Sequence, residues 1–266
     1  KNSEKNPEKN SEFVQCMLDY LKQSIDEFDE HIKKIEKIEK DKDNEQDKLK
    51  ALEMESQKTF KEDNAKGFIG RENDLKAIQD YIENDNSQAL VIYGPSGMGK
   101  SALMAKAIKQ TENNHKDKQK LVYRFVAATA SLSTSVAVLI SILKELGIKE
   151  SIKIIKDEFG QDKPEELDQF FARISNHLSK LEKPTIIFID AVDQFTNQEA
   201  LTEGHEFGWL PSVLPSNLKI VISALEDDNY PEDSKYLELL KTKTSNLHKL
   251  EAFNAVHAQE MIRGIL

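Results

Sequence analysis

Apolar residues in the first 35 positions recur at alternating steps of three and four. Charged residues fill the positions between them, which is the a/d pattern of a helix that packs along one narrow seam. The pattern predicts either a coiled coil or one helix of a bundle within the same chain. The seam consists of Val14, Leu18, Leu21, Ile25, Phe28, Ile32 and Ile35.

Polar segments bound this seam on both sides. Residues 1–10 are polar and low in complexity, so we expect them to be disordered. Residues 41–48 lack apolar side chains and interrupt the seam, and the apolar positions that follow indicate a second helix near Phe60. We therefore assign residues 1–63 to an N-terminal helical, coiled-coil-like arm and residues 64–266 to a second domain.

The pattern changes in the second domain, where short apolar runs alternate with stretches of helical periodicity. Such runs are typical of strands buried on both faces of a parallel sheet, with helices in the connections. Five strands are predicted, at 89–93, 121–126, 185–190, 218–223 and 247–250. Helices are predicted at 72–82, 102–108 and 136–146, from about 165, and from 254.

A glycine-rich loop joins the first predicted strand to the helix that follows it. This order of strand, Gly-x4-Gly-Lys-Ser and helix is the P-loop pattern. Its glycines let backbone N–H groups turn toward phosphate oxygens, and the helix N-terminus adds partial positive charge. Lys100 is expected to reach the terminal phosphates and assist catalysis, and the Ser101 hydroxyl to bind Mg²⁺. The predicted nucleotide contacts are Gly94, Pro95, Ser96, Gly97, Met98, Gly99, Lys100, Ser101 and Ala102.

A carboxylate ends the third predicted strand, where ligands bind in open α/β sheets. Asp190 follows four consecutive apolar residues and is expected to hold Mg²⁺ beside Ser101. Three residues later, Asp193 is a candidate to orient or activate the attacking water, with Gln194 as the alternative. Ser223 ends the fourth strand and is expected to face the γ-phosphate as a sensor. The fold class is therefore α/β, a P-loop NTPase with a parallel five-stranded sheet flanked by helices.

Composition narrows the setting and the partners. A net charge of −10 argues against bulk electrostatic binding to nucleic acid or to an anionic membrane. No run approaches the roughly 18 apolar residues of a membrane span. Cys16 is the only cysteine, which favours a reducing, cytoplasmic location. The chain begins without methionine and ends within an apolar pattern, so we expect it to be a piece of a longer protein.

These segments resemble the STAND class of P-loop NTPases, and within it the NACHT-like group of telomerase-associated protein and nephrocystin. The resemblance covers residues 64–266. Residues 67–75 resemble the Gly-Arg-Glu segment of AAA+ and related NTPases, which packs over the adenine in those families. This resemblance implies that the backbone of Phe68 and Ile69 contacts adenine and that Arg71 contacts the nucleotide. In order along the chain, the matching segments are 67–75, 94–101, 123–126 with its Ser/Thr-rich loop, 186–195, 209–223 and 250–266.

The resemblance implies a signalling switch, closed with ADP and assembling with ATP, in defence, stress or scaffold signalling. Self-association on activation follows, and the arm would engage a protein partner or a second copy. Two other functions remain open. One is an AAA+ or origin-recognition-type ATPase acting on protein or DNA, and the other is a non-enzymatic scaffold stabilised by nucleotide.

Two departures from the family pattern bear on hydrolysis. Gln194 replaces the second acidic residue after the Mg²⁺-binding strand, and no arginine follows Ser223. The sequence therefore predicts slow ATP hydrolysis in the isolated chain. A partner copy would have to supply an arginine finger, for which Arg124 and Arg173 are the candidates.

Overall fold

The computed structural model describes residues 22, 30, 48–66, 68–114, 118–148, 154–156, 162–164, 167–195, 207–227 and 234–252. The chain divides into two compact units, Lys1–Leu52 and Glu53–Leu266. In the first unit, residues 48–52 are helical, and the predicted seam lies outside the described residues. The helix predicted from residue 254 lies outside them as well. The boundary predicted at 63/64 stays a prediction, and residues 53–63 fall in the compact unit that contains the sheet.

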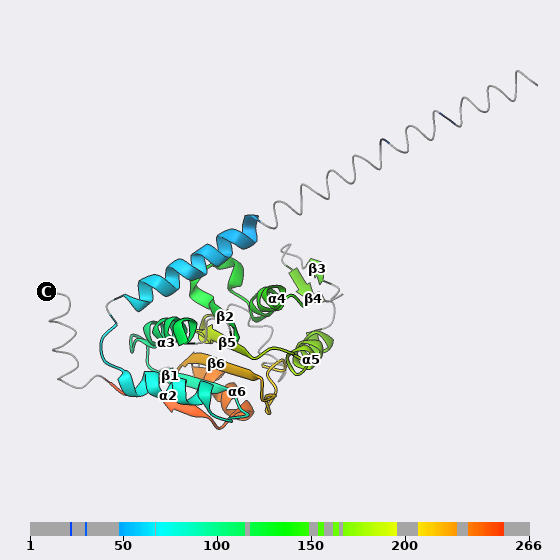
Figure 1. Cartoon of the computed structure of the whole chain (residues 1–266). Helices are drawn as coiled ribbons and strands as arrows, with labels where there is room; N and C mark the ends of the chain where they lie inside the picture. Colours follow the sequence, from blue (N-terminus) through cyan, green and yellow to red (C-terminus); the bar gives the residue numbers. More distant parts are fainter. Residues whose placement is uncertain are drawn as a thin grey trace, which may run out of the picture. The chain divides into compact units, whose positions relative to one another are not determined.

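A five-stranded parallel sheet forms the centre of the second unit (Figure 1), as the apolar runs predict. The spatial order is β2-β5-β6-β1-β7. Strand β6 therefore lies between the strand before the P-loop, β1, and the strand that ends in Asp190, β5. The strands are β1 (Leu90–Gly94), β2 (Lys120–Phe125), β5 (Thr185–Asp190), β6 (Leu218–Leu225) and β7 (Leu247–Lys249).

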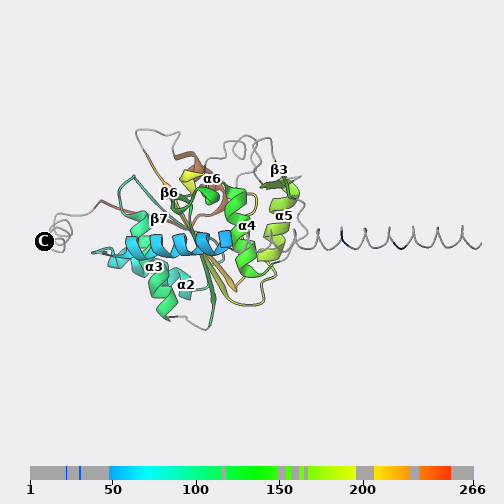
Figure 2. The same ribbon diagram turned by 90° about the horizontal axis from the view of Figure 1, so that it is seen from above.

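Helices cover both faces of the sheet, because alternate strand residues point to opposite sides. One face packs against α2 (Glu72–Glu83) and α3 (Lys100–Asn114), which lie side by side in Figure 2. The other packs against α4 (Ser135–Leu146), α5 (Leu167–Leu178) and α6 (Lys235–Lys243). In β5, Ile186 and Phe188 belong to the first cluster, and Ile187 and Ile189 to the second.

The alternation in β5 and β6 also decides where the polar residues point. Asp190 continues the series of Ile186 and Phe188, and Ser223 continues that of Val221. Both side chains therefore lie on the α3 side of the sheet. They lie near the carboxyl ends of their strands, at the same edge of the sheet as the P-loop, which follows β1. The fold thus directs a carboxylate and a hydroxyl toward the N-terminus of α3.

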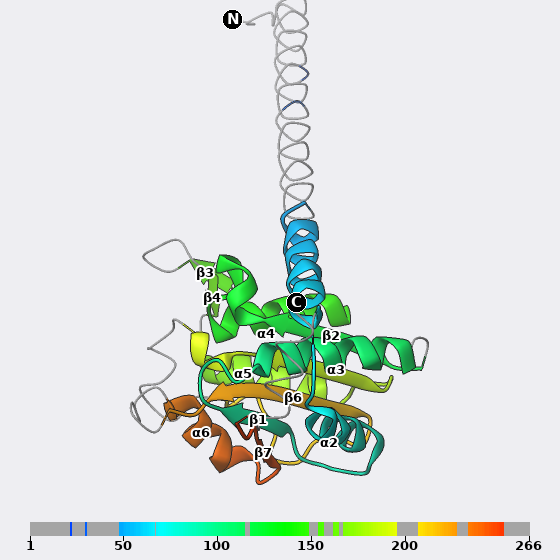
Figure 3. The same cartoon turned by 90° about the vertical axis from the view of Figure 1, so that its left-hand side faces the viewer.

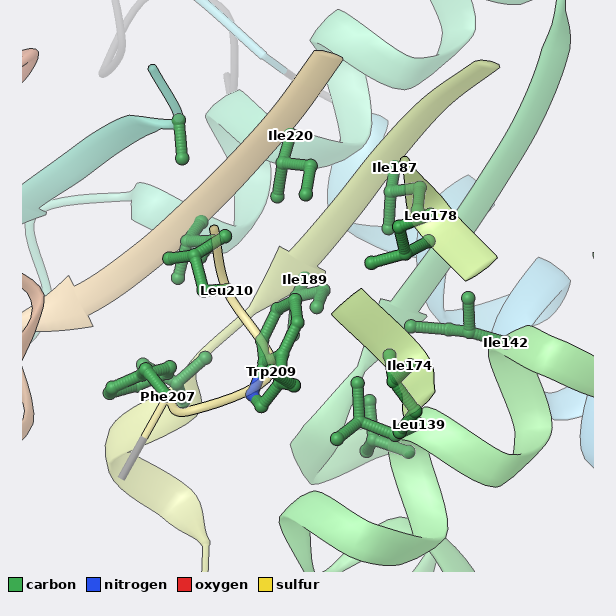
Figure 4. Close-up of a cluster of buried hydrophobic side chains, with 14 of the residues drawn as sticks. Leu139, Ile142, Ile174, Leu178, Ile187, Ile189, Phe207, Trp209, Leu210 and Ile220 are labelled. Carbon is green, nitrogen blue, oxygen red and sulfur yellow. The ribbon is translucent and has the colours of Figure 1, made fainter. Parts of the chain in front are cut away.

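Trp209 anchors the second core cluster, as the sequence predicts for a packing residue. It is 3% exposed and packs with Ile189 of β5 and Ile174 of α5 (Figure 4). The ring of Phe207 lies 6.2 Å from the Trp209 ring. The loop before β6 is thereby fixed against the sheet.

The structure differs from the sequence prediction between α4 and α5. A two-stranded antiparallel hairpin, β3 (Ile154–Lys156) with β4 (Asp162–Pro164), occupies a stretch without a clear pattern. Pro164 is the last residue of β4, and proline is tolerated there because a strand of a two-stranded sheet is an edge strand whose outer N–H groups need no ladder partner. The predicted loop after β2 contains two short 3-10 turns, η1 (Val126–Ala128) and η2 (Ala130–Leu132).

Candidate functional site

The P-loop runs from Gly94 at the end of β1 to the first turn of α3. Gly97 and Gly99 have φ values of 77° and 83°, in the left-handed region that glycine adopts at little cost. Space remains beside both, since a Cβ on either would meet nothing within 4 Å. The loop therefore has the backbone that the phosphate-cradle prediction requires.

Lys100 folds back over this loop. Its Nζ donates hydrogen bonds to the carbonyl oxygens of Gly94 and Pro95, at 2.7 and 2.9 Å. Burial lowers the pKa of Lys100, and the carboxylates of Asp193 and Asp190 oppose this shift. The ammonium group is thus held where the loop encloses it, with two carboxylates close enough to influence its charge.

Asp190, Ser101 and Ser223 form one hydrogen-bonded group near the carboxyl ends of β5 and β6. Asp190 ends β5, whereas β6 continues beyond Ser223 to Leu225 and is longer than the sequence predicts. Asp190 is 2% exposed. Ser223 Oγ donates to Asp190 Oδ1 over 2.5 Å, and the Ser101 side chain also hydrogen-bonds to Asp190. Burial raises the pKa of Asp190, while the hydrogen bonds from Ser223 and Ser101 and the charge of Lys100 lower it. The predicted metal pair of Ser101 and Asp190 is brought together.

Ser223 has a second role that its position alone does not reveal. Its Oγ accepts a hydrogen bond from the Ala191 N–H at 2.8 Å, and Ala191 has a left-handed φ of 59°. One fully buried hydroxyl therefore holds both the carboxylate and the turn after it. Direct contact of Ser223 with the γ-phosphate stays a prediction.

Asp193 and Gln194 lie in the 3-10 turn η3 (Val192–Gln194), directly after that bend. Gln194 Nε2 donates to Asp193 Oδ2 at 3.0 Å. The other carboxylate oxygen, Oδ1, is buried without a hydrogen-bond partner in the described structure. Gln194 is exposed, whereas Asp193 is half-buried beside Lys100, so Asp193 is the better placed of the two for chemistry at the terminal phosphate.

Arg71 joins three segments that are distant in the sequence. Its guanidinium donates to the Met98 carbonyl of the P-loop at 2.9 Å and to the Glu251 carbonyl at 2.8 Å. It also pairs with Asp74, whose other oxygen lies 2.7 Å from His248 Nε2. Sequence reasoning expected Arg71 to contact nucleotide and missed this bracing role, since no pattern links residue 71 to residues 248 and 251.

The two predicted adenine neighbours precede Arg71. Phe68 packs against the first core cluster, with Lys106 Nζ of α3 5.8 Å from its ring centre. Ile69 is half-buried beside it. The backbone contacts of Phe68 and Ile69 with adenine remain predictions.

Arg124 does not fit the predicted role of an arginine finger. It is 5% exposed and donates to Ser141 Oγ, the Ser141 carbonyl and the Tyr123 carbonyl. It also pairs with Glu145 at 2.7 Å. A finger must reach into another subunit's site, and this guanidinium is instead buried between β2 and α4. Arg173, on α5, is exposed.

The donor set at this edge fits Mg²⁺. A buried carboxylate and a serine hydroxyl are hard oxygen ligands of the kind Mg²⁺ prefers. The unpartnered Asp193 Oδ1 adds a second buried acceptor nearby. Asp190 and Ser101 are therefore the residues that would hold the ion.

The sequence of this chain is similar to those of known proteins. A family model described as an ATPase domain predominantly from Archaea matches residues 68–206, just over half of the chain. A TPR repeat-containing protein of Dictyostelium discoideum is 25% identical over 213 residues, covering 67% of this chain and 12% of that protein. A human NACHT domain- and WD repeat-containing protein is 24% identical over 161 residues, covering 59% of this chain and 10% of that protein. The chain thus spans about a tenth of the length of these relatives.

Solved structures also align with about three quarters of the chain. The structure of the Aeropyrum pernix ORC1 protein in complex with DNA is 14% identical. The alignment covers 74% of this chain and 49% of the ORC1 chain, with a TM-score of 0.48. Domain III of the Thermotoga maritima replication initiation protein DnaA is 18% identical, and the alignment covers 76% of this chain and 72% of that one, with a TM-score of 0.41.

In the part of the chain that the structure describes, every helix is too short or too polar to span a membrane.

Proposed function

The chain belongs to the family of ATPase domains found predominantly in Archaea, and on this basis we propose that it is an ATP-binding switch of the STAND class, NACHT-like group. One observation carries the proposal: Lys100, Ser101 and Asp190 meet where β1 and β5 end, with Asp193 beside them. This is the set that binding a Mg²⁺–nucleotide complex requires. The likeness to the human NACHT protein supports the finer assignment.

Each residue has a distinct part in this proposal. The P-loop amides and Lys100 would bind the β- and γ-phosphates, and Ser101 and Asp190 would hold Mg²⁺, which would neutralise phosphate charge. The Lys100 ammonium group donates to the carbonyls of Gly94 and Pro95, and it would exchange them for phosphate oxygens when nucleotide binds. Asp193 would orient the attacking water through its carboxylate.

Hydrolysis is slow in this proposal. An arginine finger contributes a factor of about 10³–10⁵ in rate. Arg124 is buried in its own contacts, and the sequence contains no arginine between Arg173 and Arg263. In this proposal the isolated chain lacks this charge, and assembly with another copy or partner would have to supply it, with Arg173 the candidate of the two predicted fingers that remains. Slow turnover suits a switch, which must keep its nucleotide long enough to report a state.

The proposal also covers setting and partners. ATP would favour self-association, and the N-terminal arm would carry the contact to a second copy or to a protein partner. The absence of paired cysteines is consistent with a cytoplasmic protein in defence, stress or scaffold signalling.

An ATPase of the AAA+ or origin-recognition type is the second candidate. A strand placed between β1 and β5, with a polar residue near its carboxyl end, suits this type as well as a switch. The two differ in turnover and in its dependence on assembly. A third possibility, a scaffold that only binds nucleotide, predicts no turnover at any concentration.

Steady-state ATPase measurements over a range of protein concentrations distinguish these functions. A switch completed by assembly should turn over in minutes or longer when dilute and accelerate as concentration rises. Turnover above about one per second in dilute solution would favour the second candidate. Lys100→Ala should abolish nucleotide binding in calorimetry, whereas Lys76→Ala, which removes an exposed pair with Asp80, should leave it unchanged. Equal ATP affinity in wild type and Lys100→Ala would contradict nucleotide binding by this loop.

A further inference from the structure

A buried amide holds the outer edge of the sheet. Residues 53–65 are helical and are here called the edge helix, which crosses over α3 and contacts the last residue of β2 (Figure 3). Gln57 of this helix is 3% exposed. The Phe125 N–H donates to Gln57 Oε1 at 2.7 Å, and Gln57 Nε2 donates to the Phe125 carbonyl at 3.1 Å. One side chain thus satisfies both peptide groups of one strand residue.

These two hydrogen bonds replace a missing strand. β2 is the first strand in the sheet order, so no strand of the described residues lies on its outer side. Open edges are usually covered or blocked, because unpaired N–H and C=O groups attract other chains. The amide of Gln57 presents one acceptor and one donor, as the backbone of a further strand would. The edge is therefore sealed at one residue, the last of β2.

That residue lies beside the candidate catalytic turn. Phe125 pairs in register with Asp190 of β5. Immediately after Phe125 comes η1, which packs against η3, the turn that carries Asp193 and Gln194. Val126 and Val192, the first residues of these two turns, are both buried in the same cluster. Any movement of Phe125 away from the edge helix would therefore be passed to η1 and from there to η3.

Three residues four apart attach the edge helix to the sheet. Glu53 accepts from Ser141 Oγ at 2.5 Å, Gln57 holds Phe125, and Lys61 pairs with Glu112 at 2.5 Å. Residues spaced by four lie on one helix face. Lys61 is 4% exposed and its Nζ lies 4.9 Å from the centre of the Tyr123 ring. This polar face fixes the register of the helix, so the Gln57 amide is held opposite Phe125.

We propose that Gln57 is a positioning residue for ATP hydrolysis. By holding the peptide groups of Phe125 it fixes η1, and through η1 it keeps the Asp193 turn in place. The inference rests on the proposed function for its reaction, but the packing it describes does not depend on nucleotide. Gln57 touches neither the P-loop nor Lys100 in the described hydrogen bonds, so it should govern turnover and not affinity.

A glutamate at this position provides the test, because its protonation state switches the contact. The ionised carboxylate of Gln57→Glu accepts from the Phe125 N–H but places negative charge against the Phe125 carbonyl. The protonated acid donates to that carbonyl, as the amide does. Burial raises the pKa of such a carboxyl group, so the acid form should be restored at mildly acid pH. Gln79→Glu makes the same charge change on the exposed side of α2 and serves as the control.

At pH 8 the kcat of Gln57→Glu should fall about tenfold to a hundredfold, as small displacements of catalytic groups do. KM should stay within about twofold. The ratio of kcat to that of wild type should rise as the pH is lowered to 6, and Gln79→Glu should follow wild type throughout. A change in KM alone, or a kcat ratio independent of pH, would overturn the inference.

Hydrogen exchange on the nucleotide-free protein provides a second measurement that does not require turnover. In Gln57→Glu at pH 8, the amides of residues 126–128 and 192–194 should exchange faster, relative to Gln79→Glu. Unchanged protection of both turns would overturn the inference by itself. An inactive wild type would contradict the proposed hydrolysis, whereas an active wild type with an equally active Gln57→Glu would contradict the role of Gln57 alone.

Discussion

Ser223 Oγ donates a 2.5 Å hydrogen bond to Asp190 Oδ1 from the neighbouring strand and accepts one from the Ala191 N–H. The hydroxyl fixes the carboxylate on one side and the left-handed turn on the other. Left-handed φ values are costly for residues other than glycine, so the Ala191 conformation depends on such support.

Ser223→Ala should therefore weaken Mg²⁺-dependent binding and destabilise the protein. Loss of the hydroxyl leaves a buried N–H and a buried carboxylate with one fewer partner each, at a cost of about 1–3 kcal/mol. It also removes a hydrogen bond that lowers the pKa of Asp190, so Mg²⁺ binding should require a higher pH. Isothermal titration at several pH values and urea unfolding measure both effects. An unchanged unfolding free energy would show that the hydroxyl is not a support.

Asp190→Asn should stabilise the nucleotide-free protein while abolishing its Mg²⁺ dependence. Burial raises the pKa of Asp190 in the folded state. A raised carboxyl pKa means that folding binds protons, so stability falls as pH rises from the unfolded-state pKa through the folded-state pKa. At neutral pH the amide removes this cost, and each kcal/mol gained raises Tm by about 2–4 °C. A variant with a lower Tm than wild type at pH 7 would contradict this assignment of cost.

Asp193→Asn should slow hydrolysis and leave ATP bound. The substitution keeps the shape of the side chain in η3 but removes the negative charge that orients water. Single-turnover measurements with saturating enzyme should show a lower rate with an unchanged nucleotide affinity. An unchanged rate would transfer the role to Gln194, which Gln194→Ala would then test.

The N-terminal seam should mediate self-association. Its residues lie outside the described part of the chain, so this stays a prediction from the heptad pattern. Burial of one such side chain contributes about 1.5–3 kcal/mol, and Ile25→Asp combined with Phe28→Asp should therefore abolish association. Sedimentation velocity measures the change. A monomer in both wild type and variant would indicate that the seam packs within the chain.

The sheet and the backbone of the P-loop could be predicted because their signals are local. Apolar runs gave the five strands, and the P-loop is contiguous between Gly94 and Ser101. Asp190 was recognised because a carboxylate after four buried residues is a simple pattern. Helix α4 was equally accessible, since Gly147 ends it with a φ of 76°.

Other features could not be found in this way, because their partners are far apart and polar. The amide of Gln57 meets Phe125 across 68 positions, and Arg71 meets Glu251 across 180. The edge helix buries Gln57 and Lys61, so a search for apolar periodicity misses the face that packs. The prediction that Arg124 could act as an arginine finger was wrong for a related reason, because its burial against α4 cannot be seen in the sequence.

The alternation of side chains along β5 couples the position of the Asp190 carboxylate to the packing of the core. Asp190 reaches the P-loop only because it shares a side with Ile186 and Phe188. Inserting one residue within β5 would turn every following side chain to the opposite side. The carboxylate would then point toward the apolar cluster that contains Trp209 and Ile174. A one-residue change in the length of β5 should therefore disturb the site and the packing of the core together.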